Sequence, residues 1–314
     1  MLMVILQTII PVFFTIALGK ILSSKGVLNA GGIAQVKNLC VNVFLPVMAF
    51  DALIHGSYSK DSIILISLEF FMLFSAWGIG FLIKKFFDVS IRDYIPYALP
   101  TYEGGLFGWA LIAILVGEKN LFYIISMDIF SGVFGFTVMY IGFKIINGEQ
   151  PSKKEIALSI AKNPLIISVV LGFTGAALGL GKTIDNSSFA ALYSKLIGMF
   201  TAPLTTLILV SIGSGLTFSR NIISRGIKFT VVRILIQSVI CILVLKIIGW
   251  TIGMNGILLL SLLMYFSCPP SFLISIYSQK KEAVEFSSAV ISLQIIFALA
   301  VFSLLLVFSA KLLP

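Results

Sequence analysis

The chain has 314 residues, of which 59% are hydrophobic and only 11% are charged, and its formal net charge is +9. Together with a mean hydropathy of +1.09, this composition excludes a soluble domain and predicts an all-α integral membrane protein. The three cysteines lie in apolar segments and there is a single histidine, so we expect no disulfide framework, no metal site and no cofactor.

Apolar windows of about 20 residues predict ten transmembrane helices. In chain order they cover residues 2–23, 33–55, 61–83, 94–116, 120–146, 157–180, 189–216, 227–249, 254–278 and 286–311. The first segment has neither a basic leader nor a small-residue cleavage site, so we expect a retained span rather than a signal peptide.

The cations are unevenly divided between the two membrane faces. Sixteen of the 22 Lys and Arg residues, Lys37 and Arg233 among them, are nearer to one face. By the positive-inside rule this face is cytoplasmic, which places the central loop inside and both termini outside in the cell membrane. The cations occur in ones and twos without interleaved aromatic residues, so nucleic acid is not an expected partner.

An odd number of spans in each half predicts two inverted repeats. The expected divisions are residues 1–146 (first five-helix repeat), 147–156 (cytoplasmic linker) and 157–314 (second repeat). Prolines recur at corresponding places in the two halves, although six unrelated kinks are the alternative explanation. The pairs are Pro11 with Pro164, Pro46 with Pro203, and Pro100 with Pro269–Pro270.

The fourth span contains YALPTYEGGLFGWAL, residues 97–111, with a proline, an acid and three glycines. Pro100 disfavours helix at the residue before it, and the glycines allow unusual backbone angles and close approaches. The ninth span contains YFSCPPSFLISIYS, whose consecutive prolines exclude an ordinary helix. Two broken helices at matching depth predict a binding site at the bilayer midplane, because unwound peptide groups must avoid lipid.

Two acids lie at membrane depth near these breaks. A carboxylate there costs about 2.5 to 3.5 kcal/mol, so Glu103 and Asp128 should be paired, hydrated or protonated. Glu103 is a candidate for binding a proton, a cation or a substrate, and the alternative is a structural acid that caps loosened N–H groups. We expect Glu103 and Asp128 to carry any ion or proton coupling.

The candidates for substrate binding lie at the two helix breaks, except for Asn42, which belongs to the second predicted span. The predicted substrate-binding residues are Asn42, Pro100, Thr101, Glu103, Gly104, Gly105, Cys268, Pro269, Pro270 and Ser271. No nucleophile and base can be paired with one histidine at a span end, so an enzyme is not expected.

Three stretches resemble the auxin efflux carrier family, within the superfamily that contains bile acid sodium symporters. They are VNVFLPVMAF (41–50), KNPLIISVVLGFTGAALGL (162–180) and MFTAPLTTLILVSIGSGL (199–216). With the ten-span length, the resemblance covers the whole chain. It implies inverted repeats, a scaffold and a transport domain, broken helices 4 and 9 that cross at the substrate site, and elevator-type transport of an organic anion.

The fourth span departs from the family pattern. Glu103 stands where the family usually has asparagine, and the later glycine-x-proline is missing, since Gly108 is followed by Trp109 and Ala110. An unprotonated glutamate conflicts with an anionic substrate, and the missing proline affects the second half-helix.

The sequence therefore predicts a secondary transporter of a small organic acid or related metabolite, either a uniporter or proton-coupled. A sodium-coupled symporter of the same fold and a non-transporting ligand sensor are the alternatives. The expected partners are a small-molecule substrate and membrane lipid. The one protein assembly considered is a homodimer.

Overall fold

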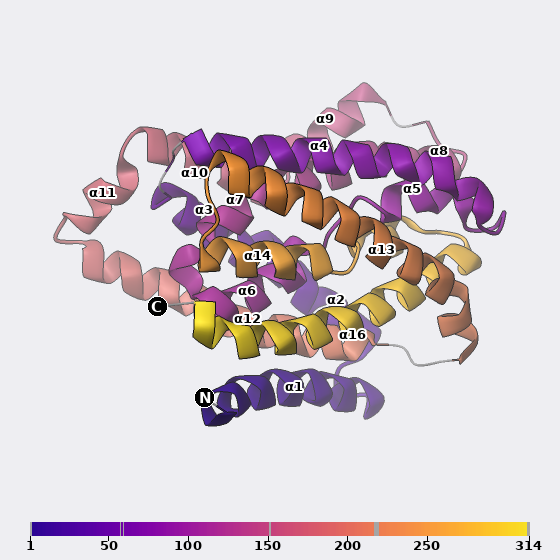
Figure 1. Cartoon of the computed structure of the whole chain (residues 1–314), viewed down its shortest axis with the longest axis horizontal. Coiled ribbons are helices and arrows are strands. Elements are labelled where there is room, and N and C mark those ends of the chain that lie inside the picture. The colour runs from indigo at the N-terminus through magenta and orange to yellow at the C-terminus, as the bar shows by residue number, and fades with distance from the viewer. Residues whose placement is uncertain (1, 57, 59, 151, 217–219, 313–314) are drawn as a thin grey trace.

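A computed structural model describes residues 2–56, 58, 60–150, 152–216 and 220–312, and these residues form helices and loops without any strand (Figure 1). The helices of the first half are α1 (Leu2–Ser24), α2 (Ala30–Leu39), α3 (Leu45–Ile54), α4 (Lys60–Ile83), α5 (Ile95–Ala98), α6 (Trp109–Val116), α7 (Phe122–Phe134) and α8 (Tyr140–Ile146). Those of the second half are α9 (Lys153–Ala161), α10 (Pro164–Ala177), α11 (Leu180–Asp185), α12 (Ala190–Gly215), α13 (Arg220–Thr251), α14 (Gly256–Ser267), α15 (Leu273–Tyr277) and α16 (Lys281–Leu312).

Each apolar segment expected from hydropathy is mainly helical. Among the described residues, five helices are long and apolar enough to cross a membrane, or six if one pair bent by 116° counts as a single span. That pair joins residues 104–116 to 118–125, which the sequence assigns to two separate spans. An all-helical membrane protein is therefore established, while ten crossings stay a prediction.

Polar turns explain where helix ends differ from the hydropathy windows. Helices α13 and α16 begin earlier than expected, at Arg220 and Lys281, because their first turns are polar. The sixth segment is wrong at its start: α9 and α10 are separate helices, divided at Lys162–Asn163. Pro164 thus occupies the first turn of α10, where its missing N–H needs no partner, and not a kink inside a span.

Helix α9 begins inside the expected linker. The Ser152 side chain accepts from the Glu155 N–H, and the Glu155 carboxylate accepts from the Ser152 N–H. This capping box starts a helix in a sequence too polar for a span. Pro151, within the same linker, lies outside the described residues.

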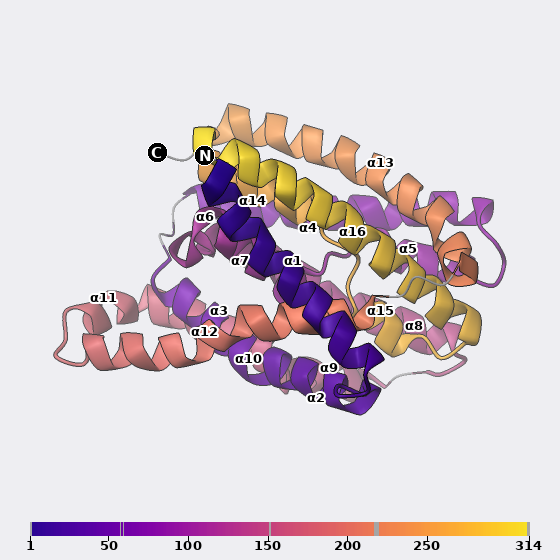
Figure 2. The same cartoon turned by 90° about the horizontal axis from the view of Figure 1, so that it is seen from below.

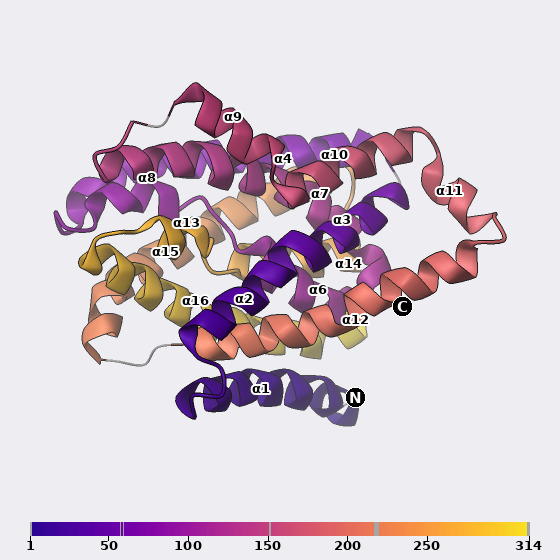
Figure 3. The same cartoon turned by 180° about the vertical axis from the view of Figure 1, so that it is seen from behind.

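The helices form two groups, which Figure 2 shows as the lower and upper parts of the molecule, with α1 of the first group running diagonally across both in this view. In the first group, α1 packs on α12 and α3 packs on α10, and α12 also lies beside α2 and α3 (Figure 3). In the second group, α4 packs on α7, α13 packs on α16, and α14 contacts both α6 and α16. The two groups meet around the broken segments.

Both predicted helix interruptions are confirmed. Residues 99–103 separate α5 from a π-helical turn, Gly104–Gly108, that continues into α6. Residues 268–272 separate α14 from α15. The Glu103 N–H donates to the Pro269 carbonyl at 2.8 Å, so the two interruptions are in direct contact.

The packing of α1 on α12 depends on two glycines. A Cβ atom at Gly213 would lie 1.8 Å from the Ile16 carbonyl oxygen, and one at Gly19 would lie 2.1 Å from the Val210 carbonyl oxygen. Neither backbone can retreat without separating the helices, because each glycine faces the main chain of the other helix. Close helix approach at small residues is a common basis of packing in membranes.

We expect Gly213→Ala to lower the free energy of unfolding by about 1–3 kcal/mol, because the new methyl group overpacks this contact. Gly198→Ala on the same helix is the matched control, since no atom lies within 4 Å of its Cβ position. The control should leave stability unchanged or raise it by up to about 1 kcal/mol. Thermal melting of the detergent-solubilised variants measures both, and equal melting of Gly213→Ala and wild type would contradict the close contact.

Candidate functional site

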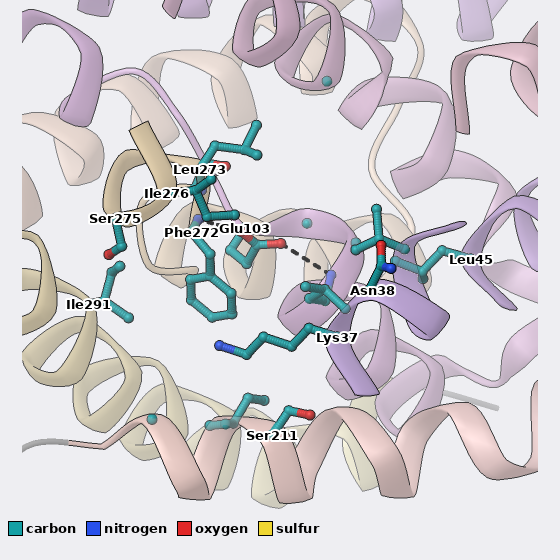
Figure 4. A pocket seen from close by; sticks show the side chains of 18 of the residues that line it. Lys37, Asn38, Leu45, Glu103, Ser211, Phe272, Leu273, Ser275, Ile276 and Ile291 are labelled. Carbon is teal, nitrogen blue, oxygen red and sulfur yellow. Dashed lines mark hydrogen bonds between the residues drawn. The ribbon is translucent and has the colours of Figure 1, made fainter. Parts of the chain in front are cut away.

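A cavity of about 720 Å³ lies between the two helix groups. The first group contributes Lys37, Asn38 and Ser211 from α2 and α12, and the second contributes Glu103 and Ser271 from the two interruptions. This volume falls within the range of sites for small metabolites. Figure 4 shows Lys37 and Ser211 on one side of the cavity and Glu103 and Phe272 on the other.

The two interruptions pack closely behind the cavity. A Cβ atom at Gly108 would lie 2.9 Å from the Cys268 sulfur, and one at Gly104 would lie 1.9 Å from an Asp128 carboxylate oxygen. Glycine at 108 thus allows the two interruptions to approach each other, and glycine at 104 allows the first interruption to approach α7. The Ser271 N–H also donates to the Thr101 hydroxyl at 3.4 Å, a second hydrogen bond between the interruptions.

Arg233 and Gln237 of α13 bind the carbonyls freed by the breaks. The Arg233 guanidinium donates to the Thr101 carbonyl at 2.6 Å and to the Cys268 carbonyl at 3.0 Å. It also donates to the Gln294 side chain of α16 at 3.1 Å, and Gln237 donates to the Leu99 carbonyl at 2.6 Å. Arg233 is 1% exposed and lies over the Tyr102 ring, 5.3 Å from its centre. One side chain thereby holds both breaks together.

Glu103 binds the N–H groups on the other side of the breaks. Its carboxylate accepts from the Phe272 N–H at 2.6 Å and from the Leu106 N–H at 3.3 Å. These donors belong to the first turns of the two helical segments that follow the breaks. The structural alternative, in which Glu103 caps N–H groups left free by the breaks, is thus present in the structure.

The charges at the breaks follow the helix dipoles. Arg233 binds the carbonyl of Cys268, the residue that caps the negative C-terminal end of α14, and the carbonyl of Thr101 in the segment that follows α5. Glu103 lies where the next helical segments begin, and their free N–H groups carry partial positive charge. Each half-helix end therefore meets a side chain of opposite charge, which allows interrupted backbone to persist at this depth.

Lys37 is the one cation among the residues that line the cavity. Its amine lies 5.1 Å from the centre of the Phe272 ring, and it interacts electrostatically with Glu103. Because Glu103 already accepts two main-chain hydrogen bonds, the amine keeps donors available for a ligand in the cavity. An anionic group placed beside Lys37 would lie between the two helix groups.

A second cluster of acids lies next to the cavity. The Tyr265 hydroxyl of α14 is 3.0 Å from a Glu69 carboxylate oxygen and 2.9 Å from an Asp128 carboxylate oxygen. Glu69 belongs to α4 and Asp128 to α7, so three helices of the second group contribute. Asp128 lines the cavity, whereas Glu69 is fully buried.

The predicted site residues fall into two sets. Those that line the cavity are Asn42, Glu103, Gly104, Gly105, Asp128 and Ser271. The others lie buried behind it, at the contact between the interruptions: Pro100, Thr101, Cys268, Pro269 and Pro270. The second set shapes the backbone and does not reach the cavity wall.

Several functional side chains escaped the sequence analysis. Lys37 and Arg233 had been counted with the cytoplasmic cations, but Lys37 lines the cavity and Arg233 is buried at the breaks. Arg233 follows the basic first turns of α13 and precedes 18 mostly apolar residues of the same helix. The sequence therefore does not indicate whether Arg233 lies at the membrane surface or inside the membrane. Asn163 and Ser211 also line the cavity, and a single polar residue in a predicted span does not by itself indicate a site.

Arg233→Met should lower the free energy of unfolding by at least about 2 kcal/mol, because it leaves the Thr101 and Cys268 carbonyls buried without this donor. Arg233→Lys should lie between this variant and wild type, since an ammonium cannot reproduce the planar fork. Arg92→Met removes an exposed cation and serves as the control. Thermal melting in detergent gives the order, and wild-type melting of Arg233→Met would contradict the assigned role.

Comparison with known proteins places this geometry in a family. No curated protein matches the sequence. Residues 4–306 match the model of a family described as membrane transport protein. The chain therefore belongs to this family, the auxin efflux carrier family, whose members are membrane transporters rather than enzymes.

Proposed function

We propose that the protein is a secondary transporter that carries a small organic acid by elevator-type alternating access coupled to protons. The observation that carries this proposal is the cavity between two helix groups, with one wall made by two broken helices. Movement of the second group along the first would carry that wall and its ligand across the membrane.

Packing supports ten crossings arranged as inverted repeats over residues 1–146 and 157–314. The contact of α1 with α12 has its counterpart in that of α10 with α3. Likewise, the contact of α4 with α7 has its counterpart in that of α13 with α16. These pairs correspond if the first five spans are matched in order to the last five, which is the relation expected of a repeat.

The cavity charges support an acid as substrate. Lys37 offers an ammonium group, while Glu103 is engaged by main-chain N–H groups. A substrate carboxylate can therefore bind Lys37 with Asn38 and Ser211 nearby as further hydrogen-bond partners. Because Asp128 also lines the cavity, neutralising it by a proton would favour the same anion.

Cation distribution supports a cell membrane location with the central loop cytoplasmic and both termini outside. Without Lys37 and Arg233, fourteen of the original sixteen cations remain on the cytoplasmic side, against six on the other. The positive-inside bias is preserved. A homodimer stays a prediction.

Counterflow in proteoliposomes tests transport directly. Vesicles loaded with an unlabelled carboxylate should take up the labelled compound, and a panel of carboxylates, amino acids and amines gives the substrate class. Lys37→Met should raise the KM for the best carboxylate by about 10- to 100-fold, since a hydrogen bond to a charged group contributes about 1.5–3 kcal/mol.

Lys37→Arg keeps the charge and should retain most of the affinity, and Lys25→Met removes an exposed cation outside the cavity as the matched control. Preference for an amine, or an unchanged KM in Lys37→Met, would refute the acid as substrate. Binding of a carboxylate without any counterflow would instead indicate the ligand sensor.

A further inference from the structure

The Glu69, Tyr265 and Asp128 side chains form a buried chain of hydrogen-bonding groups, here called the acid triad. The Tyr265 hydroxyl oxygen lies 3.0 Å from Glu69 Oε1 and 2.9 Å from Asp128 Oδ1. Glu69 and Tyr265 are both 0% exposed. Two carboxyl groups thus share one hydroxyl, with Glu69 shielded from solvent and Asp128 at the cavity wall.

The hydrogen atoms of the acid triad can be counted. A tyrosine hydroxyl has one hydrogen, and ionised carboxylates are acceptors only. If both acids were ionised, the hydroxyl could donate to one of them and would present a lone pair to the other. Two carboxylates that share a site retain a proton for the same reason that like charges repel. One carboxyl proton therefore belongs to the triad.

The surroundings indicate which acid holds the proton. Glu69 Oε2 is buried and has no hydrogen-bond partner among the described residues. Burying a charged carboxylate oxygen without a partner costs more free energy than burying the carbonyl oxygen of a neutral carboxyl group. A protonated Glu69 donates to the Tyr265 oxygen, and the Tyr265 hydrogen then points to an ionised Asp128. Both hydrogens of the triad then have an acceptor, and the oxygen left without a partner is uncharged.

We propose that the acid triad is the proton-binding site of the transporter, loaded from the cavity through Asp128. This inference rests on the proposed function and assigns its coupling proton to Glu69 and Asp128 rather than Glu103. In the unloaded acid triad both acids are ionised and the Tyr265 hydroxyl donates to Glu69. A proton arriving at Asp128 is passed to the Tyr265 oxygen while the tyrosine hydrogen passes to Glu69, which leaves Glu69 neutral and Asp128 ionised again. One proton enters, one O–H bond breaks for each that forms, and nothing is oxidised or reduced.

The other ionisable groups around the acid triad do not remove the need for a proton. Glu103, Tyr102 and Cys268 are the other titratable groups that interact electrostatically with Asp128 or Tyr265, and none of them is a cation. The Arg233 guanidinium points to main-chain carbonyls, and Lys37 lies across the cavity near Glu103. Among the described residues, no cation is thus directed at Glu69 or Asp128. Repulsion between these two acids therefore favours one shared proton.

The position of the acid triad explains how proton and substrate could be coupled. Asp128 lines the cavity, so its charge repels a substrate carboxylate held by Lys37. Loading the proton lowers the negative charge of the acid triad from two to one, which strengthens anion binding, and a bound anion strengthens proton binding by the same factor. All three residues lie on helices of the second group, so a bound proton would move together with the breaks.

Proton-driven accumulation in proteoliposomes tests the assignment. For one proton per substrate, a gradient of one pH unit should give about tenfold accumulation by the wild-type protein. Glu69→Gln and Asp128→Asn should each reduce this ratio to about one. Glu118→Gln removes an exposed acid after α6 and should keep the wild-type ratio. Wild-type accumulation in both Glu69→Gln and Asp128→Asn would overturn the inference.

Infrared difference spectroscopy of the purified protein supplies a readout independent of transport. The wild type should show the carbonyl stretch of a protonated carboxyl group, shifted in heavy water, and Glu69→Gln should lose it. Retention of that band in both Glu69→Gln and Asp128→Asn would overturn the inference even if the protein transports nothing. Absence of counterflow in a wild type that shows the band would refute the transport function and leave the proton site standing.

Discussion

Main-chain hydrogen bonding inside the bilayer is the constraint on which this structure depends. The two interrupted helices expose carbonyl and N–H groups where lipid offers no partner. Arg233 binds the carbonyls of Thr101 and Cys268, and Glu103 binds the N–H groups of Leu106 and Phe272. With these bonds made, irregular backbone can form one wall of a cavity in place of an ordinary helix surface.

The same arrangement separates structural charges from charges that remain available. Glu103 and Arg233 form hydrogen bonds with the main chain. The charges that remain available to a ligand in the cavity are Lys37 on the first helix group and Asp128 on the second. A ligand that bridges these groups would sense both, and its binding would depend on their charges and their separation. This dependence is the physical basis of the link that we propose between substrate, proton and movement.

The sequence predicted the elements well because hydropathy and proline report on them directly. The breaks at Pro100 and at Pro269–Pro270 follow from proline combined with nearby glycines or with a second proline, whereas Pro11 and Pro203 lie inside the continuous helices α1 and α12. The start of α10 at Pro164 was misassigned because an amphipathic helix and a short apolar helix read as one segment. Partners distant in sequence, such as Arg233 with Thr101 or Tyr265 with Glu69, could not be predicted, since no local pattern specifies them.

The central claim is that the broken helices face a cavity that opens to one side of the membrane at a time. Ser271→Cys tests it most directly when the three native cysteines, all buried, are replaced. We expect a membrane-impermeant maleimide to label this cysteine from either side of oriented vesicles, with labelling slowed by a bound carboxylate. Labelling from one side alone, under every substrate and pH condition, would contradict the account.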